Sequence, residues 1–112
     1  MSNGGFMSHT LACELSDKFA AVASVTGSMT IDQVLNSCNP SISRPVMQIH
    51  GTADNVVPFD GNTWMAPVED VVNLWVSKNE CDTDPIITPV ADEDTTDGST
   101  ACLLYTSPSP RD

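Results

Sequence analysis

The sequence is poor in basic residues: 4 Lys and Arg stand against 15 Asp and Glu in 112 residues, for a formal net charge of −11. This excess of negative charge repels phosphate backbones and anionic lipid headgroups, so neither nucleic acid nor a membrane surface is expected as a partner. The sequence also lacks an apolar run approaching the roughly 20 residues of a membrane-spanning helix. These absences reduce the classes of partner that are expected, but they do not indicate an activity.

Cysteine pairs of the CxxC type are absent as well. The four cysteines are widely spaced, which leaves a zinc or redox function with little support. The acidic run 92–94, together with Asp97, lacks the spacing of a calcium-binding loop and is better explained as a solvated turn. We therefore expect no metal ion and no organic cofactor.

Both ends of the sequence have unusual features. Met1 is followed at once by a small polar stretch and a helical pattern, which is typical of the middle of a strand–turn–helix unit. Residues 102–112 match the in-frame translation of a transposase-type sequencing adapter, although composition alone also allows an ordinary Ser/Pro-rich tail. The hairpin turn signal Asp97-Gly98 leads directly into this tail. We expect 1–101 to be a natural segment truncated at both ends, and 102–112 to be non-native and disordered.

Between these ends, the hydrophobic pattern alternates between helix and strand periods. Met7, Leu11 and Leu15 recur every four residues, which predicts a helix from Asn3 to about Leu15 with these side chains on one face. The further predicted elements are strands at 20–25, 45–51 and 86–90, a short helix at 30–37, and a helix at 67–79 with apolar periodicity at Val68, Val71, Val72 and Trp75. Such alternation predicts an α/β fold with a parallel sheet flanked by helices.

The stretch Ser2-Asn3-Gly4-Gly5 is a candidate catalytic turn. A serine between a strand and a helix, with small neighbours, is the arrangement called a nucleophile elbow. The turn is tight, which accounts for Gly4, and the backbone N–H of Asn3 is placed to face a developing oxyanion. Only the second half of the G-x-S-x-G pattern is present, and the alternative is a polar turn that simply caps a helix.

The second candidate is Asp54, in His50-Gly51-Thr52-Ala53-Asp54 after the predicted strand 45–51. Acids of serine triads occupy such loops, where they orient the histidine, and the order Ser then Asp fits α/β-hydrolases, in which the histidine comes last. One alternative is a loop Asp that caps a turn. A phosphate-accepting Asp is disfavoured, since no acidic cluster for Mg²⁺ lies beside an earlier strand.

Together, these motifs resemble the polyhydroxybutyrate depolymerase-like esterases, a group that includes feruloyl and acetylxylan esterases. The resemblance rests on SNGGFMSHTLACELSDKFAAVASVTGSM, RPVMQIHGTADNVVPFDG and VEDVVNLWVSKNECD, which cover most of 1–101. It implies a partial α/β-hydrolase fold, with Ser2 as nucleophile, Asp54 as triad acid and the Asn3 amide as one oxyanion donor. It also implies a polyester or acylated polysaccharide as substrate.

The sequence departs from this family in two respects. The family's catalytic histidine lies in a Gly-Gly-His-Thr-Trp-Pro-like segment that this chain does not contain, and the upstream loop with the other oxyanion donor is also absent. His50 is expected to bond backbone at a strand end, and His9 to lie on a helix face pointing away from the turn. The 112-residue chain is therefore expected to be inactive.

The cysteines fit an exported enzyme, either extracellular or periplasmic. Cys13 and Cys38 are candidates for a disulfide, and the alternative is that the cysteines are reduced. Trp64 is a candidate for lining a substrate groove, although a lone aromatic residue in a loop more often packs internally. The sequence thus predicts a carboxylic ester hydrolase, with a non-catalytic binding module as the alternative from another class. The oligomeric state is left open.

Overall fold

The computed structural model describes residues 1–105. The chain divides into two units, Met1–Asn79 and Glu80–Asp112, which we describe separately. The elements of the first unit are α1 (Asn3–Glu14), β1 (Val22–Val25), η1 (Gln33–Ser37), β2 (Val46–Ile49) and α2 (Val68–Lys78). Those of the second are β3 (Ile86–Pro89) and β4 (Cys102–Tyr105). Among the described residues, no helix has both the length and the apolar character needed to cross a bilayer.

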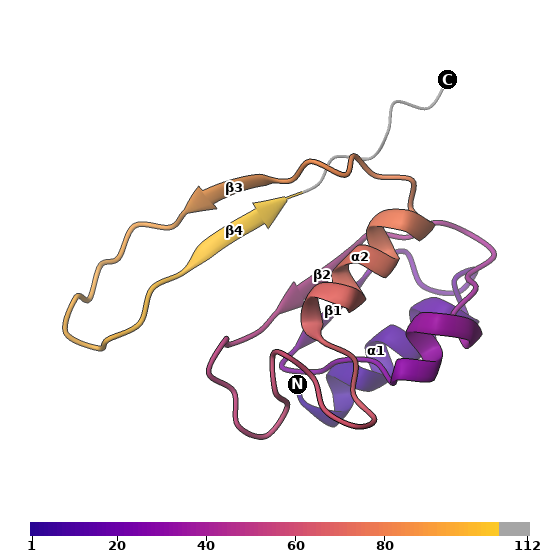
Figure 1. Cartoon of the computed structure of the whole chain (residues 1–112). Helices are drawn as coiled ribbons and strands as arrows, with labels where there is room; N and C mark the ends of the chain where they lie inside the picture. Colours follow the sequence, from indigo (N-terminus) through magenta and orange to yellow (C-terminus); the bar gives the residue numbers. More distant parts are fainter. Residues whose placement is uncertain (106–112) are drawn as a thin grey trace. The chain divides into compact units, whose positions relative to one another are not determined.

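The first unit is built on a parallel pair of strands, β1 and β2, whose register aligns Val22 with Val46 and Val25 with Ile49. Helix α1 packs against β1, and α2 packs against the π-helical turn η1 (Figure 1). Alternate residues of β2 face opposite ways. Met47 and Ile49 are 57% and 50% exposed, whereas Gln48 takes part in internal hydrogen bonds. This outer face is thus largely open to solvent, whereas both faces of a parallel sheet are normally covered.

Helix α1 has the predicted span, and its buried residues are Gly5, His9, Ala12 and Cys13. The long apolar side chains that were expected to share one face are more accessible, and Met7 is 55% exposed. Small residues occupy the buried face because the helix lies close to the end of β1. His9 lies on this helix, as expected, and its side chain is fully buried.

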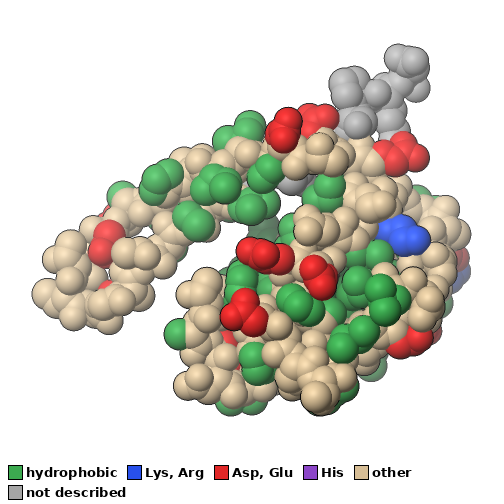
Figure 2. All heavy atoms as spheres, viewed as in Figure 1, with side chains coloured by type: hydrophobic (Ala, Val, Ile, Leu, Met, Phe, Trp, Pro, Cys, Tyr) green, Lys and Arg blue, Asp and Glu red, His purple; other side chains and the backbone are tan. Residues whose placement is uncertain are grey.

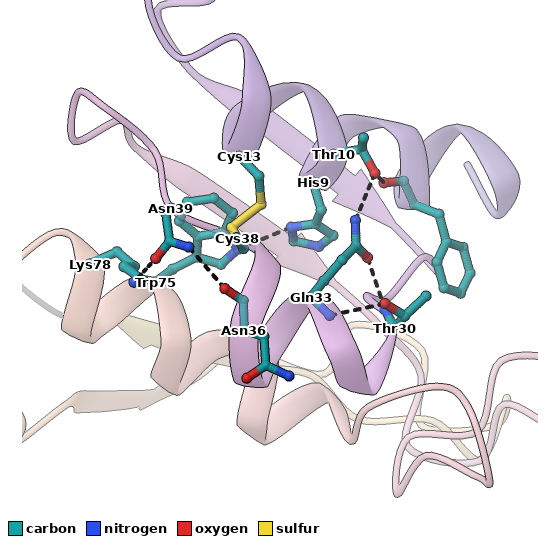
Figure 3. The surroundings of a disulfide bond; sticks show 11 residues. His9, Thr10, Cys13, Thr30, Gln33, Asn36, Cys38, Asn39, Trp75 and Lys78 are labelled. Atoms are coloured by element: carbon teal, nitrogen blue, oxygen red, sulfur yellow. Dashed lines mark hydrogen bonds between the residues drawn. A yellow bond between two sulfur atoms is a disulfide. The ribbon is translucent and has the colours of Figure 1, made fainter.

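The core of the first unit lies between the two helices and the inner face of the sheet. Helix α2 contributes Val71 and Trp75, as its apolar periodicity predicts, and the buried Met29 lies beside them. The structure joins Cys13 and Cys38 by a disulfide, the pair considered from the sequence. The bond links α1 to the residue after η1, and Trp75 points toward His9 from α2 (Figure 3).

The second unit is an antiparallel hairpin that pairs Ile86 with Tyr105 and Pro89 with Cys102. Residues 102–105, expected to be disordered, therefore form a strand. Their apolar Leu-Leu-Tyr run suits a pleated structure, and the turn signal at Asp97-Gly98 lies between the strands, with Gly98 at φ 72°. The rest of the predicted disordered segment, 106–112, lies outside the described residues. Hydrophobic side chains line the hairpin surface (Figure 2).

The observed architecture is a small mixed α/β domain with a short parallel sheet, followed by a hairpin. The predicted strand at 86–90 exists as β3, but it pairs with β4 and not with the parallel sheet. The α/β class is confirmed by the sheet and its helices, while the specific α/β-hydrolase fold remains a prediction.

Candidate active site

Ser2 lies at the junction between the carboxyl end of β1 and the start of α1. Its backbone N–H donates to the Val25 carbonyl oxygen at 2.8 Å, and its own carbonyl accepts from the N–H groups of Gly5 and Phe6. Although Ser2 occupies the N-cap position, its side chain makes no capping hydrogen bond. The alternative interpretation of a simple capping serine is therefore not supported by the geometry, because the hydroxyl is left exposed and unengaged by the helix.

The backbone of Ser2 is strained, with φ 50° and ψ −115°. A serine with positive φ costs on the order of 1–3 kcal/mol and persists only where the surrounding structure enforces it. Thr26, at the end of β1, also has φ 50°, and its hydroxyl oxygen lies 3.3 Å from the Ser2 nitrogen. Strain of this kind clusters at functional sites, and it is the conformation that a strand-to-helix nucleophile turn requires.

The close approach that enforces this turn involves Gly5 and Gly27. A Cβ on Gly5 would lie 2.7 Å from the Ser24 hydroxyl oxygen and 2.8 Å from the Gly27 Cα. A Cβ on Gly4 would meet nothing within 4 Å among the described residues. The explanation of Gly4 given from the sequence was thus wrong, since it is Gly5 that must be small. The backbones of α1 and the β1 end are in direct contact beneath Ser2.

The Asn3 amide, the candidate oxyanion donor, lies at the start of α1. Asn3 is the first residue of α1, and within residues 1–105 its backbone N–H has no acceptor. The first N–H groups of a helix are unsatisfied by the helix itself and carry partial positive charge. An anionic oxygen near Ser2 would therefore meet a free donor there.

Asp54 lies in the loop that follows β2, the strand paired with β1. Its Oδ1 accepts hydrogen bonds from the backbone N–H groups of Val57 at 2.9 Å and Val56 at 2.8 Å. These bonds hold the pKa of Asp54 below its usual value, with a smaller contribution from the nearby His50. Asp54 thus remains ionised at neutral pH, and its second oxygen, Oδ2, is free of backbone bonds.

His50 is not the partner of Asp54 in the way a triad requires. Its Nε2 donates to the Val57 carbonyl at 2.8 Å, while Asp54 Oδ2 lies 3.7 Å away, beyond hydrogen-bond distance. Its Nδ1 faces the Gln48 side-chain amide at 3.0 Å. The structure therefore gives His50 the backbone-bonding position that the sequence analysis expects.

A buried hydrogen-bond chain connects the two histidines. Trp75 Nε1 donates to His9 Nδ1 at 3.1 Å, and His9 Nε2 donates to Gln48 Oε1 at 2.8 Å. The Gln48 amide then donates to the Gly27 carbonyl at 2.7 Å and to His50. Burial lowers the pKa of His9, and the Gln48 hydrogen bond opposes this only in part. Both imidazoles are thus occupied at both ring nitrogens.

Gln48 was missed by the sequence analysis. The available signal was a polar residue at an inward position of an apolar strand, in step with Val46 and His50. An amide that faces the protein interior needs hydrogen-bond partners, and the partly buried Gln48 finds three of them in His9, His50 and the Gly27 carbonyl. His50 binds the Val57 carbonyl, and Asp54 binds the Val57 N–H. The hydrogen-bond chain through Gln48 and His50 therefore also anchors the loop that contains Asp54.

A pocket of about 430 Å³ opens beside Ser2. Its wall combines the turn of the candidate nucleophile with the loop that bonds Asp54, and is formed by Ser2, Asn3, Phe6, Val56, Val57, Trp64 and Met65. The carboxyl ends of neighbouring parallel strands meet at one edge of a sheet, which is where ligands bind in open α/β sheets. The structure thus brings the Ser2 turn and the Asp54 loop to one pocket. Trp64, a candidate groove residue, also lines it.

Within residues 1–105, no group of three or more His, Cys, Asp or Glu side chains is arranged to hold a metal ion. The polar groups at the pocket are the Ser2 hydroxyl and the Asn3 backbone N–H, and the Asp54 carboxylate lies two residues before the lining residue Val56. A hydroxyl, a free N–H donor and a carboxylate are group types that serine hydrolases use, but neither histidine of the chain has a free ring nitrogen to act as a base.

Comparisons with known proteins connect this chain to esterases. It is 43% identical over 60 residues to a protein of Nocardia uniformis subsp. tsuyamanensis named as the esterase NocK, covering 54% of this chain and 17% of NocK. It is 37% identical over 82 residues to a protein of Aspergillus terreus (strain NIH 2624) named as feruloyl esterase C, covering 71% of this chain and 26% of that protein. Both names give the activity as provisional. No protein-family model matches the chain.

The chain spans about a quarter or less of the length of these two relatives. Identity at this level over partial stretches supports a general relationship to esterases.

Proposed function

We propose that this chain carries the nucleophile and the acid of a serine ester hydrolase, with Ser2 and Asp54 in these roles and the Asn3 amide as one oxyanion donor. The observation that carries the proposal is the strained backbone of Ser2, whose side chain forms no helix cap. A capping serine has no need of positive φ, whereas a nucleophile at a strand-to-helix turn does.

The proposed mechanism needs a base that the two histidines of the chain do not supply, because both are engaged at both ring nitrogens. We propose that the histidine and the second oxyanion donor come from sequence outside these 112 residues, and that 1–101 is a C-terminal-half fragment of an α/β-hydrolase catalytic domain. The outer face of β2, with Met47 and Ile49 exposed, is consistent with such further packing.

In the complete enzyme, this histidine would take the Ser2 proton as the serine oxygen attacks the ester carbonyl. The tetrahedral oxyanion would be stabilised by the Asn3 N–H, and the alcohol would leave with the proton from the histidine. Water would then hydrolyse the acyl-enzyme by the same route. Asp54, ionised and fixed by two backbone bonds, would orient the imidazole and stabilise its protonated form.

The proposed activity is polyhydroxybutyrate depolymerase-like, with feruloyl or acetylxylan esterase as the alternatives. The substrate would be a polyester or an acylated polysaccharide, and the disulfide favours an extracellular or periplasmic enzyme. A non-catalytic binding module is the competing class, and the reactivity of Ser2 separates the two.

The test is a fluorophosphonate label applied to the natural full-length reading frame that contains 1–101. We expect labelling at the residue equivalent to Ser2, lost in Ser2→Ala and retained in the matched variant Ser8→Ala, since the exposed Ser8 hydroxyl bonds only the Gly4 carbonyl. Loss of one triad member costs up to about 10⁶-fold in rate, so the 112-residue chain should not turn over p-nitrophenyl acetate. A folded full-length protein without labelling would refute the hydrolase.

A further inference from the structure

The side chain of Gln48 is the point at which the supports of the two candidate residues meet. Its Oε1 accepts from His9 at 2.8 Å, and its Nε2 lies 2.7 Å from the Gly27 carbonyl oxygen and 3.0 Å from His50 Nδ1. An amide nitrogen carries two hydrogens, so the same atom donates to both of these acceptors. Gly27 lies beneath the Ser2 turn and His50 precedes the Asp54 loop, so one amide group reaches both sides of the candidate site.

The Gly27 carbonyl fixes the orientation of the Gln48 amide. A carbonyl oxygen can only accept, so the amide nitrogen must face Gly27 and the amide oxygen must face His9. His9 Nε2 therefore carries a hydrogen, and His9 Nδ1 accepts from the Trp75 indole, which can only donate (Figure 3). Every donor in this part of the chain thus meets an acceptor in one consistent arrangement.

On the acid side, the chain continues through His50 to the loop that contains Asp54. Because His50 Nδ1 accepts from the Gln48 amide, the ring hydrogen lies on Nε2 and is donated to the Val57 carbonyl. The Val57 N–H in turn donates to Asp54 Oδ1 at 2.9 Å. The His50 side chain is only 2% exposed, so water competes little for these bonds. Gln48 is therefore connected to the Asp54 carboxylate through one imidazole and one backbone residue.

On the nucleophile side, the Gln48 amide holds the segment that lies beneath Ser2. The backbones of Gly27 and Gly5 are so close that a Cβ on Gly27 would lie 2.5 Å from the Gly5 Cα. The Gly5 N–H donates to the Ser2 carbonyl at 2.8 Å. The hydrogen bond from Gln48 to the Gly27 carbonyl is therefore one backbone contact away from the strained turn.

We infer that Gln48 is a positioning residue for the ester hydrolase, because its amide fixes the Ser2 turn and the Asp54 loop relative to each other. The role rests on the proposed function, in which both side chains serve one reaction. The pairing of β1 with β2 ends at Val25 and Ile49, and the segments beyond it need a further connection. A misplacement of about 1 Å can cost ~100-fold in rate, so this connection matters for catalysis.

The first test needs no variant. Long-range proton–nitrogen NMR of the imidazole rings in the native 112-residue chain, near neutral pH, shows which ring nitrogen carries the hydrogen. Both His9 and His50 should have the hydrogen on Nε2 and a bare Nδ1. A hydrogen on Nδ1 of either ring would overturn the inference, because the Gln48 amide could not then make the bonds that link the two segments.

The second test is Gln48→Met, which keeps the length of the side chain and removes its three hydrogen bonds. Hydrogen-exchange protection of the Val57 amide should fall about tenfold, and that of the Gly5 amide should fall as well. The pKa of Asp54 should rise toward its ordinary value as the backbone hydrogen bonds that lower it loosen. Changes on one side only would show that Gln48 does not link the two segments.

Gln33→Met is the matched control. Gln33 is also a partly buried glutamine, and its side chain bonds the Thr30 N–H and the Thr10 hydroxyl (Figure 3). We expect this variant to lower the stability of the chain without selective loss of protection at Val57 and Gly5. If it reproduces the effects of Gln48→Met, those effects reflect general loosening and the inference is wrong.

Kinetics of the natural full-length protein separate this inference from the proposed function. Gln48→Met should reduce kcat for p-nitrophenyl acetate by up to ~100-fold with little change in KM, and Gln33→Met should leave both constants unchanged. An unchanged kcat in folded Gln48→Met, with Ser2 still labelled by fluorophosphonate, would remove the positioning role and keep the hydrolase. An unreactive Ser2 in the native protein would overturn both, and Gln48 would then be a purely structural link.

Discussion

The two units of this chain differ in almost every feature that stabilises a protein. Unit 1, Met1–Asn79, contains the buried core cluster, the disulfide and the hydrogen-bond chain through Gln48. In unit 2, β3 has no buried residue, and its isoleucines Ile86 and Ile87 are 62% and 61% exposed. The hairpin is held mainly by backbone pairing, which by itself is marginally stable in water.

The comparison shows where precise geometry can be maintained. Holding Ser2 at positive φ needs surroundings that resist relaxation, and unit 1 supplies them through buried contacts. The β3 strand of the hairpin has no buried residue that could hold a strained backbone in this way. Every candidate site residue lies in unit 1. We expect the two units to differ sharply in their response to the changes below.

Loss of the disulfide should have the largest effect. The bond spans a sequence separation of 25, so replacing both cysteines in Cys13→Ala/Cys38→Ala should lower the free energy of unfolding by about 3 kcal/mol. Urea unfolding followed by circular dichroism measures this value. Amide exchange at 86–89 should be unchanged, because the bond lies entirely within unit 1. Equal losses of protection in both units would contradict their independence.

The Gly5 contact should have the next largest effect. Gly5→Ala forces a Cβ against Gly27 and Ser24, and overpacking of this kind costs about 1–3 kcal/mol. Gly4→Ala is the matched control one residue away, where open space and helical conformation predict a neutral to stabilising change of under about 1 kcal/mol. The thermal unfolding midpoints of the two variants, each compared with that of the native chain, measure the two effects. Similar midpoints for the two variants would refute the backbone contact.

Acidification should weaken unit 1 through His9. Burial lowers the pKa of His9 from its ordinary value of 6.5, so the unfolded state takes up the proton first as the pH falls. The stability is complete above pH 6.5 and is lost as the pH falls through the folded pKa, by at most about 1.4 kcal/mol per pH unit. Urea midpoints between pH 7.5 and 5.5 measure the slope. His9→Gln should flatten it, and an identical slope would exclude His9 as its source.

Substitution in the hairpin should have the smallest effect. Ile86→Thr replaces an exposed side chain and should change the unfolding free energy by less than about 0.5 kcal/mol. Val71→Ala, in the core of unit 1, should cost about 2 kcal/mol by comparison. Chemical denaturation of both variants gives the two numbers. A larger loss for Ile86→Thr would mean that the hairpin buries this side chain in solution.

Element types were largely predictable from the sequence, because local periodicity determines them. Helix α2 follows directly from the spacing of Val68, Val71 and Trp75. The inner face of α1 was not predictable in this way, since small residues and a histidine occupy it and the long apolar residues do not. Hydrophobic periodicity identifies faces that bury large side chains, and α1 is defined by a backbone contact that has no such signature.

The sequence indicated which residues are candidates for the site, but not the hydrogen bonds that hold their loops in place. Ser2 and Asp54 stand out by their positions after a turn and a strand. Gln48 does not, because its role comes from partners 39 and 21 residues away in sequence. The pairing of β3 with β4 was equally hidden, since the pattern of an isolated apolar strand does not specify which neighbour it joins.

The contact between Gly5 and Gly27 places the serine by main chain alone. The neighbouring indole of Trp64 is presented by a separate loop, with its own glycine and its own asparagine. The position of Ser2 and the lining of the pocket mouth are therefore determined by different segments. Side chains around the pocket mouth can be varied without moving the backbone that positions the Ser2 hydroxyl.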